Sequence, residues 1–210
     1  MNKTLKKTLS IIITILMIVT SVPVSLAADD VNYIECSWDG TNNTVVSETK
    51  SVIEYTKITS DLTAWSTGWY VATGEVTIPS RVAVSGDVHL ILCDDAVLTV
   101  NGGVRVEGKN SLTIYGQSDG TGKLIATATT DYYAGIGSNR NGGREPSAYG
   151  TIVIHGGTVE ATGAWGGAAG IGGGALSGNG TILIYGGNIT GTGTSNGAGI
   201  GSGGTSSKMT

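Results

Sequence analysis

Between residues 74 and 204, apolar side chains alternate with polar ones in short runs, the pattern of strands with one buried face. One segment occurs twice, as GTIVIHGGTVEATG at 150–163 and as GTILIYGGNITGTG at 180–193. Each copy leads into small residues, AAGIGGG at 168–174 and GAGIGS at 197–202. Such recurrence is typical of structures built by stacking one unit on the next. Because glycine costs about 1 kcal/mol per residue in a helix, these units predict stacked strands rather than helix pairs.

The earlier part of the region repeats with a spacing of 22 residues. Three apolar pairs, Val76/Ile78, Val82/Val84 and Leu90/Leu92, recur as Leu98/Val100, Val104/Val106 and Leu112/Ile114. Each unit therefore holds three short strands separated by turns. Each set of strands forms a column that can be followed to the end of the chain. The first column continues through Leu124/Ala126, Val159/Ala161 and Ile189/Gly191. The second continues through Ile136, Ile171 and Ile200, and the third through Ile152/Ile154 and Ile182/Ile184.

These columns predict an all-β fold, a right-handed parallel β-helix of about five coils with three short strands in each. The handedness follows from the general preference of parallel crossovers rather than from particular residues. In the AGIG runs, we expect backbone to pass close to backbone, where a larger side chain would clash.

The remaining segments differ in composition from the repeats. Residues 1–27 combine three lysines, an apolar stretch and the end Ser-Leu-Ala, which predicts a secretory signal peptide. A membrane anchor is disfavoured, because a span needs about 20 apolar residues. Residues 28–74 hold three of the four Trp residues and do not repeat, so we expect an N-terminal β cap, with a small independent β module as the alternative. Residues 75–204 would form the β-helix and 205–210 a truncated or disordered tail, with further domains expected C-terminal of this chain.

Charge and cysteine content limit the classes of partner that the chain can bind and the covalent links that it can form. Without the signal peptide, 9 basic residues face 16 acidic ones, a net charge of −7. No basic patch remains, which argues against nucleic-acid binding, and no membrane contact is expected after cleavage. Export permits a disulfide between Cys36 and Cys93. Two free thiols are equally open, because nothing in the sequence fixes the distance between them.

Several of these segments resemble a known class of repeat. WYVATGEVTI at 69–78, VHLILCDD at 88–95, SLTIYGQ at 111–117 and the AGIG runs resemble Gly-rich β-helical repeats of large secreted and cell-surface proteins of Gram-positive anaerobic bacteria. More distantly, they resemble the pectin-lyase-like superfamily and its non-catalytic carbohydrate-binding members. The resemblance covers residues 69–204 and implies an extracellular, adhesin-like module. Fold alone does not imply activity.

An enzyme, either a polysaccharide lyase or a glycoside hydrolase, is disfavoured by the charge pattern. Glycosidases need two carboxylates about 5–9.5 Å apart, and the resemblance implies that lyases of this fold cluster acidic and basic residues on one outer face. Here the outward charges are sparse, and no acidic pair follows Asp94-Asp95 one coil later. The glycine runs lack the Asp of calcium-binding repeats, and no Cys/His grouping has zinc spacing. We therefore expect no catalysis, no cofactor and no metal.

The candidate ligand site is a column of rings. If Ile152 and Ile154 point inward, then Tyr115, His155 and Tyr185 point outward on successive coils, and Trp165 in a Gly-rich turn would extend the column. Aromatic faces suit sugar rings, so the sequence favours a secreted surface module that binds polysaccharide or cell-wall glycan. Two alternatives stay open: rings that only stabilise the repeat, and a structural spacer with no ligand.

Overall fold

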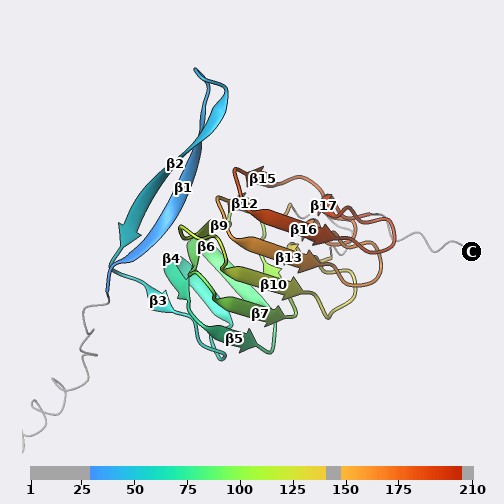
Figure 1. Ribbon diagram of the computed structural model, residues 1–210. Coiled ribbons are helices and arrows are strands. Elements are labelled where there is room, and N and C mark those ends of the chain that lie inside the picture. The colour runs from blue at the N-terminus through green and yellow to red at the C-terminus, as the bar shows by residue number, and fades with distance from the viewer. Residues whose placement is uncertain (1–28, 141–147, 205–210) are drawn as a thin grey trace, which may run out of the picture.

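The structure is a computed structural model that describes residues 29–140 and 148–204, and it is all-β within those ranges (Figure 1). Its strands are β1 (Val31–Asp39), β2 (Thr44–Val52), β3 (Thr56–Lys57), β4 (Ala64–Ala72), β5 (Glu75–Ile78), β6 (Val82–Leu92), β7 (Val97–Asn101), β8 (Val104–Arg105), β9 (Ser111–Gly116), β10 (Lys123–Thr127), β11 (Ile136–Gly137), β12 (Thr151–Ile154), β13 (Thr158–Thr162), β14 (Ile171–Gly172), β15 (Thr181–Ile184), β16 (Asn188–Thr192) and β17 (Ile200–Gly201). Across the described ranges, no helix is long and apolar enough to cross a membrane. The predicted signal peptide and tail lie outside the described residues.

Two parallel sheets make up the body of the molecule. One has five strands in the order β16-β13-β10-β7-β5, visible as a stack in Figure 1. The other contains the path β15-β12-β9-β6-β8-β11-β14-β17, with β4 joined to β6 and β3 to β4. The 11-residue strand β6 belongs to two ladders, because Val82–Ala83 pair with β8 whereas Asp87–Leu92 pair with β9. The sheet therefore changes direction within β6.

The strand register confirms the first two predicted columns. In the five-stranded sheet, the aligned residues are Val76, Leu98, Leu124, Val159 and Ile189. In the second column they are Val82, Val104, Ile136, Ile171 and Ile200. Like residues thus lie one above another at the strand spacing of about 4.8 Å. Most of these side chains are fully buried in one apolar core.

The third column departs from the predicted 22-residue spacing. Val88 pairs with Leu112 and Leu90 pairs with Ile114, so the spacing from Val88 to Leu112 is 24 residues. The two additional residues lie in the turn between β8 and β9. Because strand side chains alternate with a period of two, a shift of two residues keeps the same face inward. From Leu112/Ile114 onward, the column continues through Ile152/Ile154 and Ile182/Ile184, as predicted.

The AGIG runs bring backbone against backbone, as predicted. A Cβ atom on Gly137 would lie 1.9 Å from the carbonyl oxygen of Gly172, and one on Gly172 would lie 1.9 Å from that of Gly201. The φ angles of Gly137 and Gly172 are +137° and +126°, a region that L side chains rarely adopt. Only glycine therefore fits at these positions.

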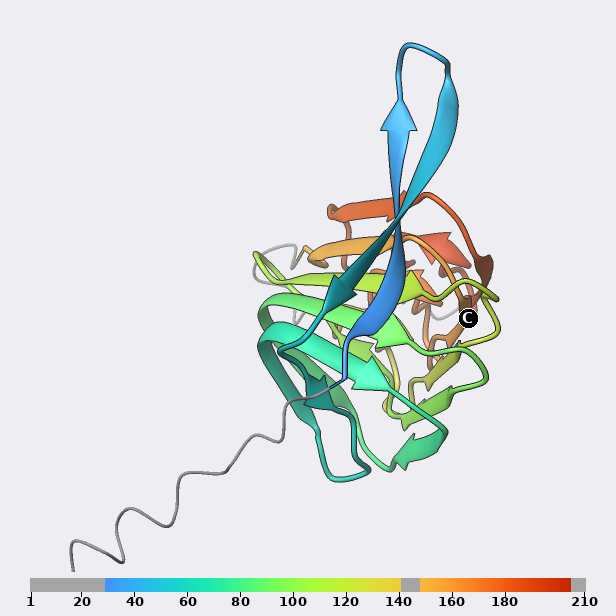
Figure 2. The ribbon, with the colours of Figure 1, turned by 60° about the vertical axis from the view of Figure 1, so that its left-hand side comes forward.

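The N-terminal segment is only partly the non-repeating cap that the sequence predicts. β1 and β2 form an antiparallel hairpin that projects from the body (Figure 2). At its turn, Asp39 Oδ1 accepts hydrogen bonds from the backbone N–H groups of Thr41 and Asn42. β4 instead joins the parallel sheet beside β6. The parallel stack therefore begins before residue 75, and Trp65 of β4 is fully buried in the main core.

Candidate functional site

The three rings predicted on successive strands do stack. Tyr115 lies in β9, and His155 and Tyr185 directly follow β12 and β15. The ring centroids of Tyr115 and His155 are 4.8 Å apart with an interplanar angle of 4°. Those of His155 and Tyr185 are 5.3 Å apart at 8°. The in-register pairing of Ile114, Ile154 and Ile184, one position earlier, sets this stack.

The ring stack is not the exposed ladder that the sequence predicts, because β1 covers part of it. Tyr115 is 3% exposed and His155 is 8% exposed. Tyr33 of β1 packs edge-on against Tyr115 with the ring centroids 4.7 Å apart. The backbone N–H of Cys36, also in β1, donates a hydrogen bond to His155 Nδ1 over 2.9 Å. Tyr115 and His155 are therefore structural contacts of the hairpin, and Tyr185 alone of the three rings stays half-exposed.

Trp69 and His89 extend the ring stack toward the N-terminus. They pair in register on β4 and β6, and their rings stack with centroids 4.4 Å apart at 18°. The His89 Nδ1 atom lies 3.1 Å from Tyr115 Oη. Tyr33 of the hairpin forms a second apolar cluster with Val71, Ile91 and Tyr115 of the body. The alternation of β4 and β6 turns Trp69 and His89 to the same outer face as Tyr115.

Burial sets the protonation of the groups under the hairpin. It lowers the pKa of His155 below its ordinary value of 6.5. Since Nδ1 accepts the bond from Cys36, the proton of the neutral ring lies on Nε2. Burial, followed by the nearby Glu35, raises the pKa of the Cys36 thiol. Cys36 therefore remains a protonated thiol, donating weakly to the His155 carbonyl oxygen over 3.4 Å, rather than an activated nucleophile.

The two cysteines are separate free thiols in the structure. Of the two alternatives left open by the sequence, the disulfide is therefore not formed. Cys36 contacts His155, whereas Cys93 follows β6 and packs against the second apolar cluster. Burial raises the pKa of Cys93 as well, and the adjacent Asp94 adds to this effect.

Trp165 lies in a different aromatic contact from the ring stack. It occupies the turn after β13 and is 61% exposed. Its ring meets that of Tyr132 edge-on with centroids 5.9 Å apart, and the Arg140 guanidinium lies 4.4 Å from the centre of the Tyr132 ring. Trp165 therefore does not extend the column of Tyr115, His155 and Tyr185. The prediction from the sequence that it would do so is wrong.

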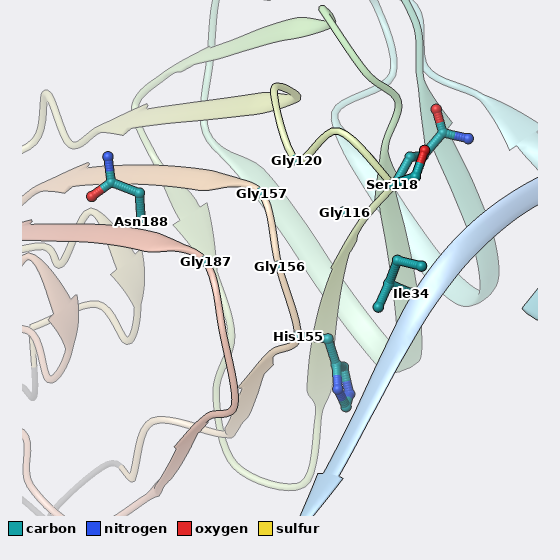
Figure 3. Close-up of a pocket in the computed structure, with 10 residues that line it drawn as sticks. Ile34, Gly116, Ser118, Gly120, His155, Gly156, Gly157, Gly187 and Asn188 are labelled. Carbon is teal, nitrogen blue, oxygen red and sulfur yellow. The ribbon is translucent and has the colours of Figure 1, made fainter. Parts of the chain in front are cut away.

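A groove of about 360 Å³ lies beside the ring stack, between β1 and the turns that follow β9, β12 and β15 (Figure 3). Its lining residues are Ile34, Gly116, Gln117, Ser118, Gly120, His155, Gly156, Gly157, Gly187 and Asn188. Ile34 reaches it from β1, and His155 from the end of β12 (Figure 3). The five glycines give the groove a surface of bare backbone.

The polar groups of the groove are neutral and held in place. Gln117 accepts a hydrogen bond from the Asp94 N–H over 2.9 Å and donates one to the Asn32 carbonyl over 2.7 Å. This side chain thereby ties β1 to the turn after β9. The ten lining residues include no Asp, Glu, Lys or Arg. The groove thus offers hydrogen-bonding groups but no carboxylate pair for glycoside hydrolysis.

Within residues 29–140 and 148–204, no group of three His, Cys, Asp or Glu side chains is arranged to hold a metal ion. Comparison of the chain with protein-family models, with curated proteins and with solved structures gives no match. The function must therefore be argued from the geometry of the described residues.

Proposed function

We propose that the parallel sheets are turns of one right-handed β-helix, with three strands per coil and about five coils. The in-register columns support this proposal, because β7, β10 and β13 of the five-stranded sheet are each followed along the chain by a strand of the second column and then one of the third. After β5, the single strand β6 serves both columns. The handedness follows from the general rule for parallel crossovers. In this arrangement the groove lies along one corner of the solenoid, where the third column turns into the first.

We further propose that this solenoid is a non-catalytic module that binds carbohydrate in the groove. The carrying observation is the combination of a 360 Å³ groove, a glycine backbone surface and neutral hydrogen-bonding side chains at Gln117, Ser118 and Asn188. Ligand pockets of small molecules begin at about 300 Å³, a size suited to one or two sugar units. Bare backbone lets a flat ring approach closely, while N–H and C=O groups can meet its hydroxyls.

The charge of the groove points to a neutral saccharide. None of its lining residues carries a positive charge that would pair with a uronate, and residues 161–204 contain no Asp, Glu, Lys or Arg at all. Buried or half-buried carboxylates need a cation or several donors to offset the loss of water. A neutral disaccharide avoids that cost. Secretion and attachment at the cell surface remain part of the proposal and rest on the composition of residues 1–27.

The test is calorimetric titration with cellobiose, xylobiose and di-N-acetylchitobiose, and with digalacturonic acid as the acidic comparison. At least one neutral disaccharide should bind, and Asn188→Ala should weaken that binding by about tenfold, which corresponds to roughly 1.4 kcal/mol. Asn101→Ala is the matched control, because Asn101 is also exposed at an end of a strand in the same sheet but does not line the groove.

A second matched pair tests the groove by filling it. Gly120 and Gly74 have φ angles of +66° and +61°, and a Cβ on either would meet no atom within 4 Å. Asn tolerates this backbone region, so Gly120→Asn and Gly74→Asn carry similar strain, but only Gly120 lines the groove. Gly120→Asn should reduce saccharide binding and Gly74→Asn should not. If none of the sugars binds, or if both pairs behave alike, the chain is better explained as a spacer.

A further inference from the structure

One end of the stack exposes residues that are buried elsewhere in it. β15, β16 and β17 each have a parallel neighbour on one side only. Ile184 is 44% exposed, whereas its column neighbour Ile154 is fully buried. Ile200 is 41% exposed in the same way, whereas its column neighbour Ile171 is fully buried. The described residues therefore leave apolar side chains of the second and third columns exposed beside the unpaired edges of β15, β16 and β17.

Among the described residues 161–204, this end has no charge or proline of the kind that usually protects a free strand edge. Natural sheets guard their edges with charges, proline or bulges, because an open edge pairs with other strands. From 161 to 204 the chain has no charged residue and no proline. The opposite end differs, because Ile58 and Trp65 are buried there in the core and the edge strand β5 begins with Glu75.

The β1–β2 hairpin projects past the same end. β1 crosses the ring stack from Tyr33 on Tyr115 to Cys36 at His155. Its distal half then continues beyond β15, as both Figures 1 and 2 show. There Trp38 is 56% exposed, and Val45, which pairs with it across the hairpin, is exposed too. The distal hairpin thus extends past β15, the last described strand of that sheet.

We propose that this end and the distal hairpin form one docking surface for a further β-coil of the same repeat type. Such a coil would place apolar side chains over Ile184, Ile189 and Ile200, and a ring over Tyr185. Its outer face would lie under the distal half of the hairpin, as the outer face of β9 lies under Tyr33. The inference goes beyond saccharide binding and depends only on the stacking of the strands.

A coil of this type fits the surface better than a second copy of the chain. Each of β15, β16 and β17 would gain a parallel partner of its own length and register, as β12, β13 and β14 already have. A two-fold related copy would reverse the strand direction and the order of the columns. It would then set the two residues of β17 against the four of β15.

The test supplies the coil in the same chain, by placing a copy of residues 176–204 directly after Gly204. The connection from β17 to the added strand then has the length of the natural connection from β14 to β15. The nearest-neighbour contacts of a solenoid add to its stability, so the melting temperature should rise by about 4 °C or more. Amide exchange at Thr181–Ile184 should slow at least tenfold.

The matched control carries Ile→Asp at the copies of Ile182 and Ile184 and should lose both effects. The proposal is overturned if the extended chain folds with unchanged exchange at β15 and an unchanged melting temperature. It is also overturned if the unmodified chain sediments as a dimer that Ile184→Lys converts to a monomer, because a second copy would then occupy the surface.

Discussion

Replacing Gly137 by alanine tests the close stacking of the second column most sharply. The added methyl group would occupy a backbone with φ of +137° and would lie 1.9 Å from the Gly172 carbonyl oxygen. The backbone strain costs about 1–3 kcal/mol. Relieving the clash requires β11 and β14 to move apart in a packed core, which costs about 1–3 kcal/mol more.

Gly108→Ala is the matched control. Gly108 also has a positive φ, +63°, but a Cβ there meets no atom within 4 Å. It therefore carries only the cost of the left-handed backbone, about 1–2 kcal/mol. Urea unfolding followed by circular dichroism should give Gly137→Ala a clearly lower free energy of unfolding than Gly108→Ala. In a chain of this size, each kcal/mol of that difference lowers the melting temperature by about 2–4 °C. Equal losses for the two variants would refute the close approach of β11 and β14.

Three further outcomes are expected. Ile154→Ala should lower the free energy of unfolding in urea by about 2–5 kcal/mol, because Ile154 is fully buried between two isoleucines. Ile53→Ala, at an exposed position, should lower it by under about 0.5 kcal/mol. Similar losses for the two variants would argue against the inward orientation of the column. Burial lowers the pKa of His155, so the unfolded chain binds this proton more readily and stability falls as the pH drops below 6.5 through that lowered pKa. Melting curves between pH 5 and 8 should show a weaker fall for His155→Gln, and an unchanged fall would contradict the neutral ring. Tyr33→Ala should loosen the hairpin and speed the reaction of Cys36 and Cys93 with a thiol reagent. An unchanged rate would mean that Tyr33 does not hold the hairpin against the ring stack.

The core columns could be predicted because their signals are local. Alternation and a fixed spacing place Ile152 over Leu112 and Ile182 without any knowledge of distant contacts. The two-residue shift at Leu90 escaped detection because a shift of two keeps every side chain on its face. Periodicity therefore fixes which face is buried more firmly than it fixes the register.

The packing of the β1–β2 hairpin on the ring stack could not be predicted in the same way. Tyr33 and Tyr115 lie far apart in the sequence, and no repeat links them. Asp39-Gly40 is a turn signal between two segments that favour strands, but such a signal does not specify the surface on which those segments lie. The groove exists only because β1 rests on that surface, so its lining residues carried no recognisable pattern of their own.

The most direct test of the account is a nuclear magnetic resonance titration with a neutral disaccharide, followed at the backbone amides and the His155 ring. We predict shifts at His155, Gly156, Gly157 and Asn188, all of which line the groove, with the indole signal of Trp165 unchanged. Shifts confined to Trp165 and Tyr132 would contradict the groove and move the binding site to that exposed aromatic pair.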